Sequence, residues 1–93
     1  MAIVDPNPKV PPHSMTEPVD VIVIGAGISG LIAAYRLKKA GFSGIVLEAS
    51  SHTGGFVFTS QDSGALIEYG AATWSIASPV IQDLIAELNL AEH

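Results

Sequence analysis

The chain has 93 residues, which limits it to one small domain with a thin core. Its formal net charge of -5 argues against nucleic acid or an anionic membrane surface as a partner. It has no cysteine, which excludes disulfides and thiolate metal sites, and no metal site is predicted. The longest apolar run is too short to span a bilayer, and no basic stretch leads into an apolar one at the N-terminus. We therefore expect a cytoplasmic protein without a transmembrane segment.

Apolar residues make up 48% of the chain, and charged residues make up 14%, compared with about 25% in average soluble domains. All Lys and Arg residues lie before residue 40, and the rest of the chain carries acidic side chains without them. So small a body leaves much of this apolar surface exposed, and exposed apolar patches mark interfaces. We expect the chain to complete its core against a partner.

The first half of the chain predicts an arm followed by a βαβ unit. Residues 1–18 hold five of the six prolines and are predicted to be extended, disordered or packed against a neighbour, with His13 as a solvated tail residue. VDVIVIGA, residues 19–26, and GIVLEA, residues 44–49, are typical of parallel strands buried on both faces. Between them, residues 29–40 have helical apolar spacing and end in cations, with Gly41 as the expected C-cap.

The second half predicts a hairpin and a second helix, so the fold class is α/β. FVFTSQ and ALIEYG, residues 56–61 and 65–70, flank a turn-forming segment, which indicates a short β-hairpin. Ser78 and Pro79 suit the N-cap and first position of a C-terminal helix. One broad apolar face of this helix is formed by Val80, Ile81, Leu84, Ile85 and Leu88.

A G-x-G-x-x-G motif, formed by Gly25, Gly27 and Gly30, lies where the first strand meets the helix. In such motifs the first glycine permits a tight turn, the second lets the backbone approach a pyrophosphate, and the third lets helix and strand pack closely. The helix N-terminus then offers unpaired N–H groups and partial positive charge to the phosphates. This junction therefore predicts a dinucleotide site that does not depend on Lys or Arg.

Glu48 strengthens this interpretation because it ends the second strand, eighteen residues after Gly30. A carboxylate at that point can accept hydrogen bonds from a ribose diol, and it repels a 2′-phosphate. The alternative is a tight strand-to-helix turn beside a surface glutamate. FAD and NAD share the ADP moiety, so this motif leaves the choice between them open.

Four segments resemble, in order, the FAD-dependent amine oxidase superfamily. They are IVIGAGISGLIAAYRL, VLEASSHTGG, IEYGAATW and SPVIQDLIAELNL. That superfamily includes monoamine, polyamine, L-amino-acid and protoporphyrinogen oxidases and carotenoid desaturases. The resemblance covers roughly residues 19–90 and implies FAD as the cofactor. It also implies that residues 19–93 form the N-terminal part of a Rossmann-like FAD-binding domain, incomplete here and completed by a partner chain.

The resemblance assigns cofactor-binding roles along the chain. The pyrophosphate lies along Gly25 to Gly30, with the backbone of Ile28 and Ser29 closest. Glu48 holds the adenosine ribose, with Ala49 beside it. The remaining positions lie near the phosphates and the flavin. They are Gly54, Gly55 and Phe56, and then Gly70, Ala71, Ala72 and Thr73 along the isoalloxazine edge.

This chain departs from the family pattern at several positions. Phe56 stands where the family usually has Arg, and His52 where another Arg is common. His52 is interpreted as a weak donor or an ordinary loop residue, and Phe56 as a packing residue. Thr73 replaces an Arg that holds the substrate carboxylate in many L-amino-acid oxidases, which favours the amine or porphyrinogen type. For Trp74 two interpretations stay open. The side chain lines a flavin or substrate cavity, or it is buried in a core or an interface.

We interpret the chain as a small FAD-binding subunit, or an N-terminal fragment, of a split or processed flavin-dependent amine oxidase. The whole complex is expected to oxidise an amine or amino acid, with hydride transfer to FAD and formation of peroxide. A larger polypeptide is expected to supply the catalytic residues, and the isolated chain is predicted to be inactive. The alternatives are a subunit of a protoporphyrinogen-oxidase or desaturase-like flavoenzyme, and a non-enzymatic regulatory module that binds an adenine dinucleotide.

Overall fold

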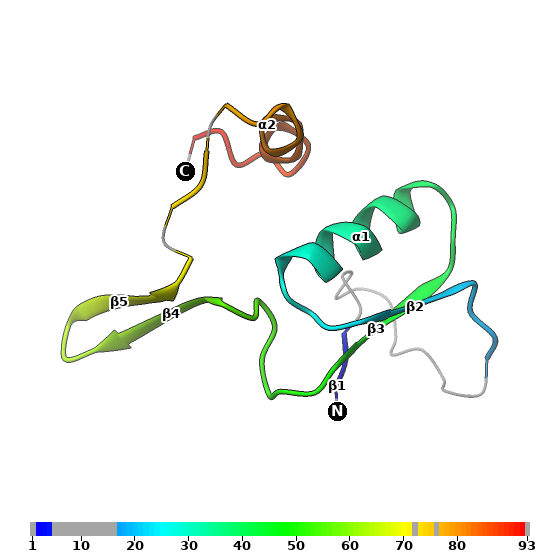
Figure 1. Cartoon of the computed structure of the whole chain (residues 1–93), viewed down its shortest axis with the longest axis horizontal. Helices are drawn as coiled ribbons and strands as arrows, with labels where there is room; N and C mark the ends of the chain where they lie inside the picture. Colours follow the sequence, from blue (N-terminus) through cyan, green and yellow to red (C-terminus); the bar gives the residue numbers. More distant parts are fainter. Residues whose placement is uncertain (1, 5–16, 72, 76, 93) are drawn as a thin grey trace.

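The chain consists of a βαβ unit, a hairpin and a second helix (Figure 1). The structure, a computed structural model, describes residues 2–4, 17–71, 73–75 and 77–92. The elements in chain order are β1 (Ala2–Val4), β2 (Val21–Ile24), α1 (Ile28–Lys39), β3 (Gly44–Glu48), β4 (Val57–Asp62), β5 (Ala65–Gly70) and α2 (Pro79–Glu87). The order predicted for residues 19–93 is confirmed.

The predicted βαβ unit is present, with β2 and β3 parallel and Val23 paired with Val46. Val46 is 1% exposed and forms the centre of the small core together with the fully buried Ala26. Helix α1 ends one residue earlier than predicted, with Ala40 as its C-cap in place of Gly41, and Gly41 follows with a φ of +92°. The N–H groups of Gly41 and Phe42 then donate to the last carbonyls of the helix.

Only one face of the sheet is covered by the described elements. Helix α1 packs on the side of Val23, where a side chain at Gly30 would contact a Val23 methyl group. On the opposite face, Ile22 is 54% exposed and Ile24 is 86% exposed. The prediction that these strands are buried on both faces is therefore wrong for this chain. Parallel sheets are normally covered on both sides, and the second covering layer is not formed by the described residues.

Strand β1 adds an antiparallel edge to the sheet, whose order is β1-β3-β2. Ala2 pairs with Glu48, and Val4 pairs with Val46. This pairing agrees with an extended arm at residues 2–4, although the sequence did not indicate a strand there. Four prolines of the arm and His13 lie outside the described residues; the prolines are Pro6, Pro8, Pro11 and Pro12.

The hairpin of β4 and β5 is confirmed, with Val57 paired with Gly70 and Asp62 with Ala65. Its two-residue turn has positive φ at Ser63 (50°) and at Gly64 (85°), the backbone that a type I′ turn requires. Across the strands, the Thr59 hydroxyl donates to the Glu68 carboxylate. Figure 1 shows the hairpin extending away from the three-stranded sheet, and nearly all of its residues are exposed.

Helix α2 begins at Pro79, as predicted, with Ser78 at the N-cap position. Ser78 caps through its backbone carbonyl, and its side chain makes no capping bond. On the predicted apolar face, Ile81 is half-buried, whereas Val80 is 63% exposed. In the described part of the chain, neither helix has the length and apolar character needed to cross a membrane.

Candidate functional site

The first two glycines of the motif shape the loop between β2 and α1. Gly25 has a φ of +98°, which other residues rarely adopt, and its N–H donates to the Leu47 carbonyl at 2.7 Å. Gly27 is the N-cap of α1, and a side chain added there would meet no atom within 4 Å. The loop therefore turns tightly beside β3 and leaves open space at its centre.

The third glycine is required by packing. A methyl group at Gly30 would overlap the carbonyl oxygen of Gly25, and it would also touch Val23. Helix α1 can approach β2 this closely because position 30 carries no side chain. The predicted packing role of Gly30 is therefore confirmed.

The N-terminus of α1 faces the space at Gly27. The first intrahelical bond runs from the Leu31 N–H to the Gly27 carbonyl at 3.0 Å, so the preceding N–H groups of Ile28 and Ser29 have no carbonyl partner within the helix. No acidic side chain lies in the first turn. These donors and the helix dipole are suited to an anionic group such as a pyrophosphate.

The Glu48 carboxylate lies against this loop, at the end of β3. Its Oε2 atom accepts from the Ala26 N–H at 2.7 Å, and its Oε1 atom accepts from the Ser50 N–H at 2.8 Å. The hydrogen bonds from Ser50 and Ala26 lower the pKa of Glu48 to about 2. Glu48 is therefore ionised at neutral pH and keeps acceptor capacity for a ribose diol. The contact with Ala26 was missed by the sequence analysis, because no sequence signal reports a side chain bonded to a distant backbone N–H.

The double glycine lies directly against the first motif. The Gly54 N–H donates to the Ala26 carbonyl at 2.7 Å, and Gly54 forms an isolated parallel bridge with Gly27. A side chain at Gly55 would come within 3.2 Å of the Gly27 Cα atom. Both glycines have positive φ, 101° for Gly54 and 60° for Gly55. The structure thus brings both glycine motifs and Glu48 together, while Ala49 is exposed next to Glu48.

Phe56 and His52 stand where the family often has Arg, and within the described residues no Lys or Arg side chain lies near the glycine loop. Phe56 is 89% exposed and packs little, so its interpretation as a packing residue is wrong for the chain alone. His52 lies in an exposed turn, where its ring is 5.0 Å from that of Phe58. The described Lys and Arg side chains all belong to the last turns of α1, at the opposite end of that helix.

The segment after β5 returns beside Phe56. The Ala71 N–H donates to the Phe56 carbonyl at 3.2 Å. Gly70 has a φ of +84°, and a side chain there would also crowd the Phe56 carbonyl oxygen. Thr73 is exposed and Trp74 is 57% exposed. Ala72 lies outside the described residues. The role of this segment at a flavin edge stays a prediction.

Comparison with known proteins agrees with this geometry. Residues 23–88 match the family described as NAD(P)-binding Rossmann-like domain. The chain belongs to this family. It is 40% identical over 72 residues to protoporphyrinogen oxidase 2 of Arabidopsis thaliana, a match that covers 77% of this chain and 14% of the relative. It is 48% identical over 66 residues to polyamine oxidase 1 of rice, covering 64% of this chain and 13% of the relative.

Solved structures extend the likeness to three dimensions. Wild-type putrescine oxidase bound to putrescine superposes with a TM-score of 0.70 at 41% identity. The match covers 76% of this chain and 16% of that chain. The chain is thus the FAD/NAD(P)-binding Rossmann segment of the flavin amine oxidase family, and it spans less than one fifth of each relative named here.

The residues present fit the adenosine and pyrophosphate of the dinucleotide that this family binds. The open space at Gly27 is a cradle that a side chain would fill, and it adjoins the first N–H groups of α1, which have no carbonyl partner within the helix. An ionised carboxylate stands at the end of the neighbouring strand. The fit is therefore to the ADP half of a dinucleotide, which FAD and NAD share.

Proposed function

We propose that this chain is the FAD-binding segment of a flavin-dependent amine oxidase whose remaining parts lie on a larger polypeptide. One observation supports it most strongly: two glycine motifs and the Glu48 carboxylate converge on the N-terminus of α1. The similarity to flavin oxidases along the same residues favours FAD over NAD.

The chain's own residues would bind and orient the cofactor. The N–H groups of Ile28 and Ser29 would donate to the pyrophosphate, and Gly27 would leave room for it. Glu48 would accept hydrogen bonds from the adenosine ribose. Gly54 and Gly55 would hold the second wall of the phosphate site through their contacts with Ala26 and Gly27.

The redox chemistry would come from the flavin when it is bound, with a hydride accepted from an amine or amino acid. The described residues near the glycine loop include no Lys or Arg, and Glu48 is assigned to the loop backbone and the adenosine ribose. The acid, base and substrate-binding groups are therefore assigned to the larger polypeptide, and the chain alone is expected to be inactive.

Two features support the need for a larger polypeptide. The sheet face of Ile22 and Ile24 is uncovered, although parallel sheets are normally buried on both sides. The relatives that share this segment are also much longer than the match. The larger polypeptide would then supply both the second layer over the sheet and the cations that face the cofactor phosphates.

The test is isolation of the native species under mild conditions, followed by an absorption spectrum and mass identification of every chain. A yellow complex containing this chain and a larger polypeptide is expected, and it should produce peroxide with an amine or amino acid. Peroxide production with a porphyrinogen instead would support the alternative substrate class. A colourless single species that binds neither FAD nor ADP would reject the proposed function.

A further inference from the structure

Ala26, at the centre of the glycine loop, is held on both sides by other segments. Its N–H donates to Glu48 Oε2 at 2.7 Å, and its carbonyl accepts from the Gly54 N–H at 2.7 Å. Ala26 is fully buried, so an unpaired N–H there would carry a desolvation penalty. The carboxylate is therefore part of what keeps the loop folded.

The second oxygen of Glu48 fixes the carboxylate itself. Oε1 accepts from the Ser50 N–H at 2.8 Å, two residues along the chain. This bond leaves the side chain little freedom to turn away from Ala26. Glu48 thus joins β3, the loop at residues 25–27 and the start of the segment that leads to the double glycine.

We propose that Glu48 is a positioning residue that holds the glycine loop in its phosphate-binding conformation before a dinucleotide arrives, in addition to its contact with the ribose. This inference rests on the proposed function and deepens it. Prior organisation of a binding loop improves affinity because less ordering is needed on binding. Removal of the carboxylate should therefore weaken ligands that have no ribose diol at all.

The test is a four-way comparison of binding constants. The full chain and its Glu48→Gln variant are titrated with ADP and with 2′,3′-dideoxy-ADP, which keeps the pyrophosphate but lacks the diol. Glutamine has one acceptor oxygen and presents an NH2 group to the second N–H, so one bond to the backbone is lost. We expect Glu48→Gln to weaken dideoxy-ADP roughly tenfold, as for loss of one charge-assisted hydrogen bond.

The matched control is Glu68→Gln, which makes the same charge change on the exposed hairpin and should leave both affinities unchanged. Equal affinity of wild type and Glu48→Gln for dideoxy-ADP would overturn the inference while leaving the proposed function intact. Failure of the wild-type chain to bind either nucleotide, both alone and in its complex with the larger polypeptide, would instead reject the proposed function.

A measurement on the wild-type chain keeps the inference testable even where Glu48→Gln does not fold. Ser50 is exposed, so its amide hydrogen should exchange slowly only when it is hydrogen-bonded. We expect slow exchange at Ser50 and Ala26 in the ligand-free chain. Exchange at Ser50 at the rate of an unfolded peptide would show that the loop is not held in advance.

Discussion

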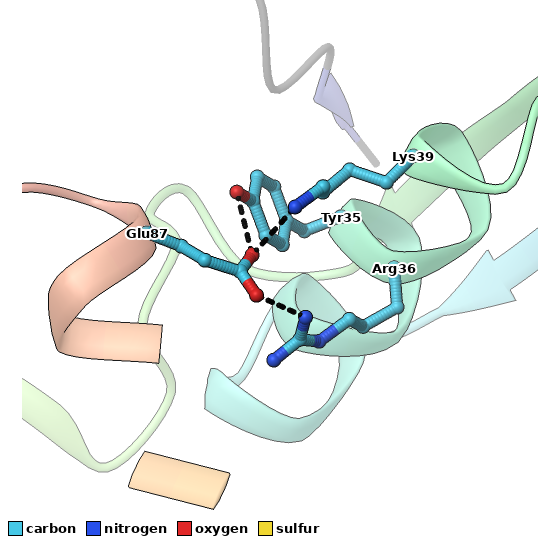
Figure 2. A network of polar contacts seen from close by, with 4 residues as sticks. All are labelled: Tyr35, Arg36, Lys39 and Glu87. Carbon is cyan, nitrogen blue, oxygen red and sulfur yellow. Dashed lines mark hydrogen bonds and ion pairs between the residues drawn. The ribbon is translucent and has the colours of Figure 1, made fainter. Parts of the chain in front are cut away.

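The Glu87 carboxylate at the end of α2 lies 2.6 Å from the Arg36 guanidinium and 2.9 Å from the Lys39 ammonium of α1 (Figure 2). The Tyr35 hydroxyl also donates to it, at 3.1 Å. The bonds from Lys39 and Arg36 lower the pKa of Glu87 to about 2. The same contact raises the pKa of Lys39. Ile81, Leu84 and Ile85 of α2 are half-buried and no residue of α2 is fully buried, so we infer that this cluster contributes, beside these side chains, to how α2 is held on α1.

Acidification should therefore release α2. The pKa of Glu87 is lower in the folded chain than its ordinary value of 4.5, so its contribution to stability is complete above pH 4.5 and lost as pH falls towards about 2. We expect the protection factors of the α2 amide hydrogens, their exchange rates relative to an unfolded peptide at the same pH, to fall across that range. Glu87→Gln should lower these protection factors already at neutral pH and leave them nearly independent of pH. Asp83→Asn, an exposed change on the same helix, is the control, and equal protection in the two variants would contradict this role.

The same Gly→Ala substitution should lower the stability of the fold at one glycine of the motif and weaken nucleotide binding at another. Gly30→Ala would place a methyl group against the Gly25 carbonyl, and overpacking of this kind costs about 1–3 kcal/mol or more. Gly27→Ala meets no atom within 4 Å and has an ordinary φ of -71°, so it should leave the free energy of unfolding nearly unchanged. Its methyl group should instead weaken ADP binding. Denaturant unfolding and nucleotide titration measure the two effects, and equal unfolding midpoints would refute this assignment.

The missing charge beside the double glycine can be supplied by substitution. Phe56→Arg would place a guanidinium at an 89% exposed position next to Gly55, and we expect it to tighten FAD binding by the isolated chain several-fold at low salt. Phe42→Arg makes the same change at the far end of α1 and should have no such effect. The gain should shrink as ionic strength rises. An unchanged or weaker affinity at low salt would show that this position does not face the cofactor phosphates.

Sequence patterns predicted the βαβ unit, the hairpin and α2 because each depends on local periodicity and turn residues, such as the Ser63 and Gly64 pair. The two faces of the sheet were predicted less well. An unbroken run of Val and Ile implies two covering layers, but the pattern does not say which chain provides them. The bond between Ala26 and Glu48 was beyond prediction, because it joins residues 22 positions apart through tertiary packing.

The uncovered sheet face gives the last prediction. Ile24 is 86% exposed beside Gly25, and burial of an isoleucine side chain stabilises by roughly 1.5–3 kcal/mol. If a larger polypeptide covers this face, Ile24→Lys should weaken the complex about tenfold or more, since each 1.4 kcal/mol is a factor of ten. Leu66→Lys, on the hairpin at 72% exposure, is a matched substitution elsewhere. Co-purification with the larger polypeptide measures both. A complex weakened by Leu66→Lys and unaffected by Ile24→Lys would place the interface on the hairpin and leave the Ile22 and Ile24 face free.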